Sequence, residues 1–407
     1  MGFLDKPFTK TQADFNNLFN QVGYNVDNAT GSLKDFYTET SYGQLDLTVT
    51  VAGPYTSQYT MSAYGGNNAS NNDTNPRGLV TEAVNSANAD VNYADFDNDN
   101  DGAVDGVYVI YAGYGEEAGA PADAIWAHAW NITELTLDGK KVSRYSCSAE
   151  LRGNSGTNLT RIGVICHEFG HVMGAADYYD SDYATSGSYN GTGNWDLMAG
   201  GSWNNNGATP AHQNAYIKVY DYHWATATTL TAGTTITLNN AEQNTNSFYR
   251  INSTTSNEYY LIENRQQHKF DSNLPGHGMI MYHVDENYME TAGNKINAGP
   301  HQGMYPVCAN ADGNPPTVYG VINGGGCPFP GTGLKTQFTD ATTPSSKSWA
   351  GLNTFRPITN ITENTTDKTV SFTYMGGTAC TPPTTQATVF STSLVTDNSM
   401  TISWTRG

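Results

Sequence analysis

Apolar residues in the first half of the chain follow helical spacing in some segments and strict alternation in others. Helical spacing, as at Phe15, Leu18 and Phe19, predicts amphipathic helices, and Ser32 and Asp35 are placed as a capping box at the start of one. The predicted helices are residues 7–20, 33–40, 76–89, 158–174 and 210–220. Alternation predicts half-buried strands. The predicted strands are residues 44–52, 107–112, 123–130 and 142–147.

The pattern changes after residue 225, where Thr-rich alternating runs replace the mixture of helices and strands. Such runs are typical of a β-sandwich-type module. They cover residues 228–238, 247–251, 258–263, 278–284 and 368–374. A long loop at 287–345 interrupts them, and the polar triplets 263–265 and 283–285 are interpreted as polar features of the same module.

These patterns predict an α+β protein in three parts. Residues 1–224 form the first domain, with a mixed sheet and a central helix, and residues 225–376 form the β-sandwich-type accessory domain. Residues 377–407 comprise a Cys/Pro/Thr-rich linker and a new alternating pattern at 387–404 that ends in Ile-Ser-Trp. That last pattern resembles the first two strands of a fibronectin type III domain.

Composition narrows the range of partners. The 407 residues carry a net charge of -19, which argues against nucleic acid and against anionic membranes. No segment approaches the roughly 20 apolar residues of a membrane span. The abundance of Asn, Thr, Ser, Gly and Tyr suits a secreted or cell-surface, β-rich protein. We expect the sequence to be a piece of a longer protein, so the lack of a signal peptide carries no information on location.

The strongest chemical signal lies in residues 162–180. His167 and His171 are four residues apart, so a helix places them on one face, at the spacing with which two imidazoles reach one zinc ion. Glu168 lies between them and is placed to reach a metal-bound water. Gly174 favours a helix end, after which the chain turns back and brings Asp177 up as a third ligand. Two histidines and one carboxylate leave the fourth position of zinc open, as in catalytic sites.

Other assignments of the third ligand remain open at this stage. Asp180 is close enough in sequence to compete with Asp177, and a downstream glutamate would define a different zinc hydrolase. A second signal is the Gly-rich turn at 193–203, where Met198 resembles the Met-turn residue of the metzincins. His128, in a predicted strand before the helix, is a candidate for lining a substrate groove, although a lone histidine in a strand is more often packed.

An acidic stretch at 95–106 has the spacing of a calcium loop. The candidate ligands are Asp97, Asp99, Asp101, Ala103 through its carbonyl group, and Asp105, with Asp95 as an additional candidate. Gly102 supplies the turn, but Tyr108 stands where an EF-hand has its bidentate Glu, and a strand follows. We therefore predict a structural calcium site without an EF-hand. The alternative is a solvated run of Asx turns.

Five cysteines are present. Cys308 and Cys327 flank a Gly/Pro/Asn-rich loop and are the candidate disulfide. Cys147 and Cys166 either pair or remain buried thiols, and Cys380 is left over.

The combined motifs resemble one known family. They are His-Glu-Phe-Gly-His-Val-Met-Gly-Ala-Ala-Asp at 167–177, Trp-Asp-Leu-Met-Ala-Gly-Gly-Ser-Trp at 195–203, and Pro210. Together with residues 31–43 and 258–285, they resemble the M6 metalloproteases of the immune inhibitor A type. The similarity spans most of residues 1–376.

The resemblance implies a metzincin-like domain and a secreted bacterial endopeptidase made as a zymogen with an N-terminal propeptide. It implies that His167, His171 and Asp177 bind zinc, that Glu168 is the general base, and that Met198 is the Met-turn residue. Most metzincins have histidine at the position of Asp177, and this departure fits the M6 pattern. Substrates would be extended segments of extracellular proteins. The rival from another class is a surface adhesin or glycan-binding protein with a protease-like shell, against which the intact Glu168 argues.

Overall fold

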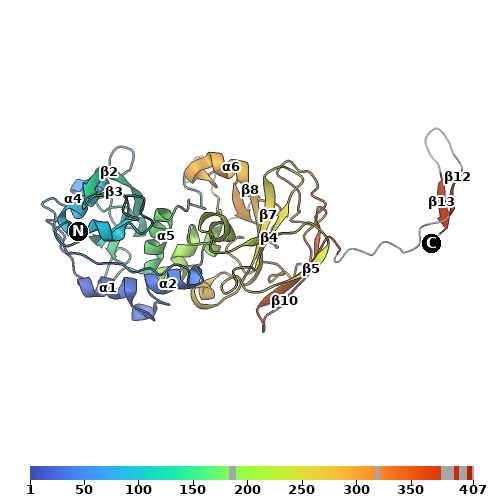
Figure 1. Cartoon of the computed structure of the whole chain (residues 1–407), viewed down its shortest axis with the longest axis horizontal. Helices are drawn as coiled ribbons and strands as arrows, with labels where there is room; N and C mark the ends of the chain where they lie inside the picture. Colours follow the sequence, from blue (N-terminus) through green and yellow to red (C-terminus); the bar gives the residue numbers. More distant parts are fainter. Residues whose placement is uncertain (183–188, 317–320, 377–388, 394–400, 406–407) are drawn as a thin grey trace.

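The computed structural model describes residues 1–182, 189–316, 321–376, 389–393 and 401–405. Figure 1 shows an α+β arrangement, with the helices and sheet of the first half at one end and the sheets of the second half beside them. None of the helices in the described part of the chain has the length and apolar character needed to span a bilayer. Cys380 and the predicted linker lie outside the described residues.

The first half contains five α-helices in its described part. They are α1 Gln12–Asn20, α2 Leu33–Thr40, α3 Ser62–Gly65, α4 Pro76–Ala87 and α5 Ile162–Val172. The capping box of α2 at Ser32 and Asp35 is confirmed. The predicted start of the first helix at residue 7 is wrong, because Thr11 is extended and caps α1 together with Asp14.

Three strands form the sheet of the first half. They are β1 Val107–Tyr114, β2 His128–Leu137 and β3 Lys140–Leu151, in the order β1-β3-β2. β1 is parallel to β3 and β2 is antiparallel to it, so the sheet is mixed, as predicted. The predicted strand at 123–130 is only partly correct, because pairing begins at His128.

The predicted strand at 44–52 is wrong. The segment crosses α1, and its backbone bonds to helix side chains: Val49 exchanges hydrogen bonds with the Asn20 amide, and the Val51 carbonyl accepts from Gln12. Its alternate apolar side chains, from Leu45 to Val51, still pack against the main core. The alternation correctly indicated that one face of the segment is buried, but the segment lies against helix α1 and not against another strand.

The predicted helix at 210–220 is only partly correct, since helical residues begin at Ala215 and continue as the π-helical segment Ile217–Asp221. The preceding amides bond to other parts of the chain: Ala211 donates to Gly201, His212 to Asp271, and Asn214 to Asp196. Amides committed in this way are not free for helical hydrogen bonds.

The described part of residues 225–376 contains two sheets. The five-stranded sheet comprises β4 Ala227–Thr229, β6 Phe248–Asn252, β7 Glu258–Arg265, β8 Gly278–Asp285 and β9 Met304–Pro306. The three-stranded sheet comprises β10 Ile358–Asn364, β11 Thr369–Tyr374 and β5 Thr234–Leu238. One apolar cluster takes residues from both sheets. The β-sandwich assignment stays a prediction.

The long segment after β8 is not a plain loop. It contains the helix α6 Glu286–Ala292, the short strand β9 and the predicted disulfide between Cys308 and Cys327. Cys147 and Cys166 are buried free thiols and are not bridged to each other. β12 Val389–Ser393 and β13 Thr401–Thr405 form an antiparallel pair, and the fibronectin-like assignment of this region stays a prediction.

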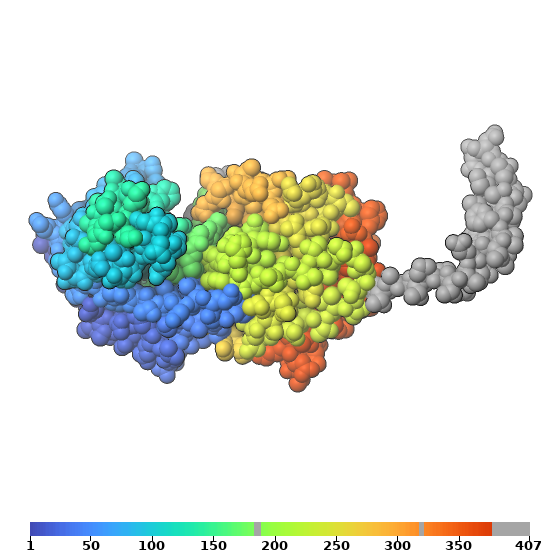
Figure 2. Space-filling model, in the orientation of Figure 1, coloured from blue at the N-terminus to red at the C-terminus, as the bar shows by residue number. Residues whose placement is uncertain are grey.

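The largest core cluster joins the two halves. It runs from Phe15 and Phe36 through Ile165 of α5 to Leu261 and Tyr282 of the five-stranded sheet. The apolar packing therefore continues across residue 224, and the predicted domain boundaries remain predictions. Figure 2 shows this face of the molecule with a notch between the cyan part of the chain and the orange part around α6, with green residues at its base.

Candidate metal centre

Helix α5 presents His167 and His171 from one face. The two rings are 4.8 Å apart between centroids and stand at 88° to each other. The helix is almost entirely buried against β3 and the segment that follows it, and both of its histidines have little exposed surface. The spacing of four residues has thus placed two imidazoles at one point, as predicted.

The helix ends where the sequence predicted. Gly174 has φ of +108°, and Ala175 donates to the carbonyl of Gly170 while Gly174 donates to that of His171, which is a Schellman motif. The carbonyl of Ala175 then accepts a hydrogen bond of 2.8 Å from Nδ1 of His171. The turn therefore reverses the chain and brings Asp177 back to the histidines.

Three acceptor atoms converge at this point. Oδ1 of Asp177 lies 3.2 Å from Nε2 of His167 and 3.2 Å from Nε2 of His171. Each Nδ1 donates to a carbonyl, of Leu197 or Ala175, so each ring, when neutral, directs its Nε2 lone pair at the carboxylate. Oδ1 of Asp177 is buried and has no hydrogen-bond donor. Facing lone pairs repel unless a cation lies among them.

The donor set fits zinc. Ligands about 2.0–2.1 Å from a tetrahedral ion lie roughly 3.3 Å from one another, close to the separations between Asp177 and the histidines. The site also favours positive charge. Burial acts against the imidazolium, but the contacts with Asp177 and Glu168 outweigh it and raise the pKa of His167 to about 9. Asp180 is not in the group: its carboxylate accepts from the backbone of Asp182 and Tyr189.

Glu168 lies beside His167, His171 and Asp177 but is not one of the three converging groups. Its side chain is buried, and burial raises the pKa of its carboxyl group above the ordinary value, while His167 and His171 oppose that rise. A carboxyl group whose pKa is shifted towards neutrality is suited to taking up and releasing a proton.

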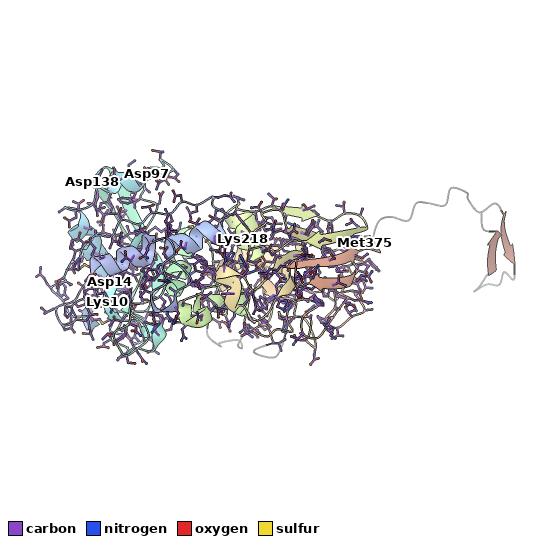
Figure 3. All side chains as sticks on the ribbon, turned by 90° about the horizontal axis from the view of Figure 1, so that it is seen from below. Lys10, Asp14, Asp97, Asp138, Lys218 and Met375 are labelled. Carbon is purple, nitrogen blue, oxygen red and sulfur yellow. A yellow bond between two sulfur atoms is a disulfide. The ribbon has the colours of Figure 1, made fainter. Side chains whose placement is uncertain are left out.

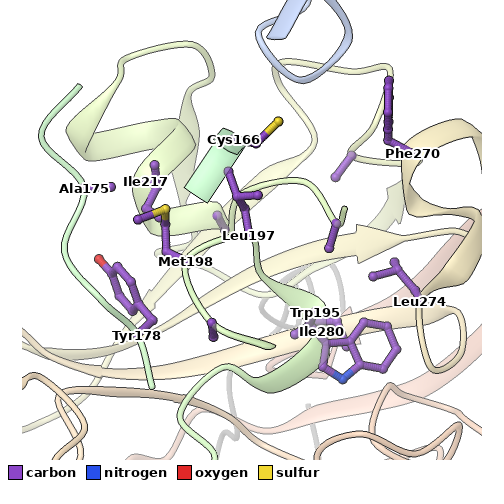
Figure 4. Close-up of a cluster of buried hydrophobic side chains, with 14 of the residues drawn as sticks. Cys166, Ala175, Tyr178, Trp195, Leu197, Met198, Ile217, Phe270, Leu274 and Ile280 are labelled. Atoms are coloured by element: carbon purple, nitrogen blue, oxygen red, sulfur yellow. The ribbon is translucent and has the colours of Figure 1, made fainter. Parts of the chain in front are cut away.

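Met198 lies under the helix. Its side chain has no exposed surface, and a Cβ atom on Gly170 would lie 2.6 Å from its sulfur, so the glycine permits this close approach. Figure 4 shows Leu197 and Met198 within the apolar cluster that surrounds the helix. The same turn offers the carbonyl of Leu197 to His167. The turn at 193–203 is therefore packed directly against the histidines.

One further contact of Asp177 has no signal in the sequence. Asn294, 117 residues after Asp177, donates from Nδ2 to Oδ2 of Asp177 at 2.6 Å and accepts from its backbone N–H at 2.7 Å. A single asparagine in the short 3-10 helix Gly293–Lys295 of the second half has no local pattern that marks it. Only the packing of the two halves brings it to the site.

The acidic stretch forms a second carboxylate group. Carboxylate oxygens of Asp97, Asp99 and Asp101 lie within 4.8 Å of one another. Oδ1 of Asp97 is buried and has no hydrogen-bond partner. Figure 3 shows Asp97 at the same end of the molecule as Asp138, well away from Lys218. Three carboxylates gathered at one point, one of them with an unpartnered buried oxygen, fit a hard cation such as calcium.

The other predicted members of that loop are placed differently. Asp105 accepts from both the backbone and the side chain of Asn98, and Asp95 accepts from Asn92; neither belongs to the group of three carboxylates. Ala103 donates its backbone N–H to Oδ1 of Asp101, and its carbonyl group stays a predicted ligand. Lys140 pairs with Asp97 and lowers the pKa of that carboxyl group.

His128 is packed rather than open. Its ring contacts the carbonyl of Trp126 and the hydroxyl of Tyr145, both at 2.7 Å, and burial lowers its pKa. β2, where it begins, is an edge strand of its sheet.

A pair of histidines one helical turn apart, a carboxylate delivered after a glycine turn and a free buried glutamate define a metallohydrolase-like site. The model of the family described as immune inhibitor A peptidase M6, catalytic domain, matches residues 6–227. The chain belongs to this M6 peptidase family.

Curated relatives agree with this assignment. The chain is 33% identical over 218 residues to the pre-pro-metalloprotease PrtV of Vibrio cholerae, a match that covers 46% of this chain and 23% of the relative. It is 29% identical over 204 residues to immune inhibitor A of Bacillus thuringiensis subsp. alesti, which covers 42% of this chain and 28% of the relative. The chain therefore spans about a quarter of the length of these relatives.

Proposed function

We propose that the chain is a zinc-dependent endopeptidase that hydrolyses internal peptide bonds of extracellular proteins. The observation that carries the proposal is the convergence of His167, His171 and Asp177 on one point, with the lone pairs of both rings fixed by carbonyl contacts on their other nitrogens. His167, His171 and Asp177 would hold zinc, and Glu168 would act as general base.

Zinc bound at this site would supply an activated water and polarise the scissile carbonyl. Glu168, buried and with a raised pKa, would take the proton of that water and deliver it to the leaving amine. Asp177, whose own pKa is held well below its usual range by the histidines despite burial, stays ionised and does not compete for the proton. The two carboxyl groups therefore have separate roles.

Secretion and synthesis as a zymogen with an N-terminal propeptide are part of the proposal. They are supported by the family and by the relative described as a pre-pro-metalloprotease. Met198 is proposed to form the apolar floor of the metal site, because its side chain lies directly against Gly170 of the helix.

Removal of zinc tests the proposal. We expect one zinc per chain by metal analysis, loss of casein cleavage on treatment with a zinc chelator, and recovery when zinc is added back. The Asp177→Ala variant should lose zinc under the same conditions, because the site then keeps only two ligands. Unaltered zinc content in that variant would favour a different third ligand. A zinc-loaded protein that cleaves no casein or proteome-derived peptide would instead favour the adhesin-like alternative.

Calcium in the acidic loop is the second part of the proposal, with Asp97, Asp99 and Asp101 as its side-chain ligands. We expect calcium at about 100 times its dissociation constant to stabilise the fold by about 2.7 kcal/mol. Thermal unfolding with calcium and with a calcium chelator should therefore differ for the wild-type chain. The Asp99→Asn variant should melt at nearly the same temperature in both conditions. Because the chelator removes zinc from this variant and from the wild type alike, a difference between the two proteins reports on the acidic loop alone. Equal melting of the wild type in both conditions would exclude a structural calcium ion.

A further inference from the structure

The third proposed ligand is held by a residue that lies outside the part of the chain matched by the family model. That part ends at residue 227, whereas Asn294 belongs to the short 3-10 helix Gly293–Lys295 after α6. Its carboxamide forms a closed pair of hydrogen bonds with one residue, accepting from the backbone N–H of Asp177 at 2.7 Å and donating to Oδ2 at 2.6 Å.

This pairing fixes the orientation of the carboxylate. Oδ2 of Asp177 is occupied by Asn294, so Oδ1 is left as the oxygen that faces both histidines. The backbone contact prevents the carboxylate from turning without breaking the second hydrogen bond. An amide is the side chain suited to this task, because it offers one donor and one acceptor at a fixed distance and carries no charge.

We propose that Asn294 is a positioning residue that presents Asp177 to the metal, so that the segment following α6 completes the site begun by the matched family region. This inference rests on the proposed zinc site. It assigns a role to the second half of the chain: none of its described residues belongs to the group of His167, His171 and Asp177, but Asn294 orients one member of that group. Contacts of this kind, behind the ligands, set metal affinity as well as geometry.

Neighbouring contacts show that the segment is docked on the ligand loop at more than one point. Ser181 donates from its hydroxyl to the carbonyl of Asn294 at 2.7 Å, and Asn297 donates to the carbonyl of Tyr178 at 2.8 Å. Asn294 is itself exposed, whereas Asn297 is fully buried. Replacement of Asn294 therefore removes the contact with Asp177 without opening the core.

The test measures zinc affinity rather than activity. The zinc dissociation constant is determined by competition with a chromophoric chelator in a Glu168→Gln background, which excludes self-cleavage. We expect Asn294→Ala to weaken zinc binding by about 10–100-fold. Asn294→Asp should weaken it at least as much near neutral pH, because two carboxylates then face each other. Two control variants should bind as the parent does: Asn287→Ala, whose side chain contacts Asn257, and Ser181→Ala, which loosens the loop without touching Asp177.

The variants separate direct positioning of Asp177 from general loosening of the loop. Unchanged zinc affinity in both Asn294 variants would overturn the inference and leave the peptidase proposal intact. An equal loss in Ser181→Ala would also overturn it, since loop fastening alone would then explain the effect. A parent chain that binds no zinc would overturn the inference and the proposed function together.

Discussion

Replacing Glu168 by Gln is expected to lower kcat for peptide hydrolysis by about 10²–10⁴-fold while zinc remains bound at one per chain. Glutamine has the same shape but cannot accept the proton of an attacking water at neutral pH. Glu168 is not one of the three converging groups, so its loss leaves the metal ligands in place. Initial rates on a quenched-fluorescence peptide, measured beside metal analysis of the same sample, check both parts.

The matched control is Glu134→Gln, which changes an exposed carboxylate on β2 with its side chain 52% exposed. That variant should keep the activity of the parent. Glu168→Gln with full casein-degrading activity would remove Glu168 from the mechanism. A variant that loses both zinc and activity would show that Glu168 supports the metal site rather than the proton transfer.

The core of the site was predictable because its determinants are local. The spacing of His167 and His171 and the glycine at 174 fix their geometry within one helix and one turn, so periodicity and backbone sterics suffice. The contact from Asn294 depends instead on how two distant segments pack. The sequence around Asp177 contains no pattern that points to Asn294. The sequence around Asn294 is polar and does not mark this asparagine as a contact of Asp177.

The errors in the fold have a related cause. Residues 44–52 alternate as a strand does, but their backbone is bonded to the side chains of Gln12 and Asn20. The amides before Ile217 are taken up by Asp196, Gly201 and Asp271. In both places, side chains or carbonyls from other segments satisfy the backbone groups that a local pattern assigns to a strand or a helix. Strands whose partners are other strands, such as β7 and β8, were predicted well.

A buried ion cluster links the second half to the turn under the metal site. Arg265, at 1% exposure, makes two hydrogen bonds of 2.8 Å to Asp271 and donates to the carbonyl of Trp195 at 2.9 Å and to Glu263 at 3.2 Å. Although burial opposes it, the guanidinium group holds the pKa of Asp271 well below its usual range. Asp271 is therefore a buried anion whose main partner is Arg265.

Replacing Arg265 by Leu is expected to destabilise the fold by about 3–5 kcal/mol, since it leaves the carboxylates of Asp271 and Glu263 buried without their cation. Arg265→Lys should lose less stability than Arg265→Leu, because lysine keeps the positive charge, although it cannot form the bidentate contact with Asp271. Urea unfolding followed by tryptophan fluorescence measures the change.

The comparison variant is Lys34→Ala, which breaks the surface ion pair with Asp46 and should cost at most about 1 kcal/mol. An Arg265→Leu variant as stable as Lys34→Ala would mean that the acids of the cluster are neutral in the folded protein and need no counter-ion. If Arg265→Leu lowers the free energy of unfolding as expected, the ion cluster stabilises the contact between the five-stranded sheet and the turn at Trp195. The carbonyl of Leu197, which orients His167, lies two residues after Trp195 in the same turn. The contact between Arg265 and Trp195 therefore also supports the position of His167 in the metal site.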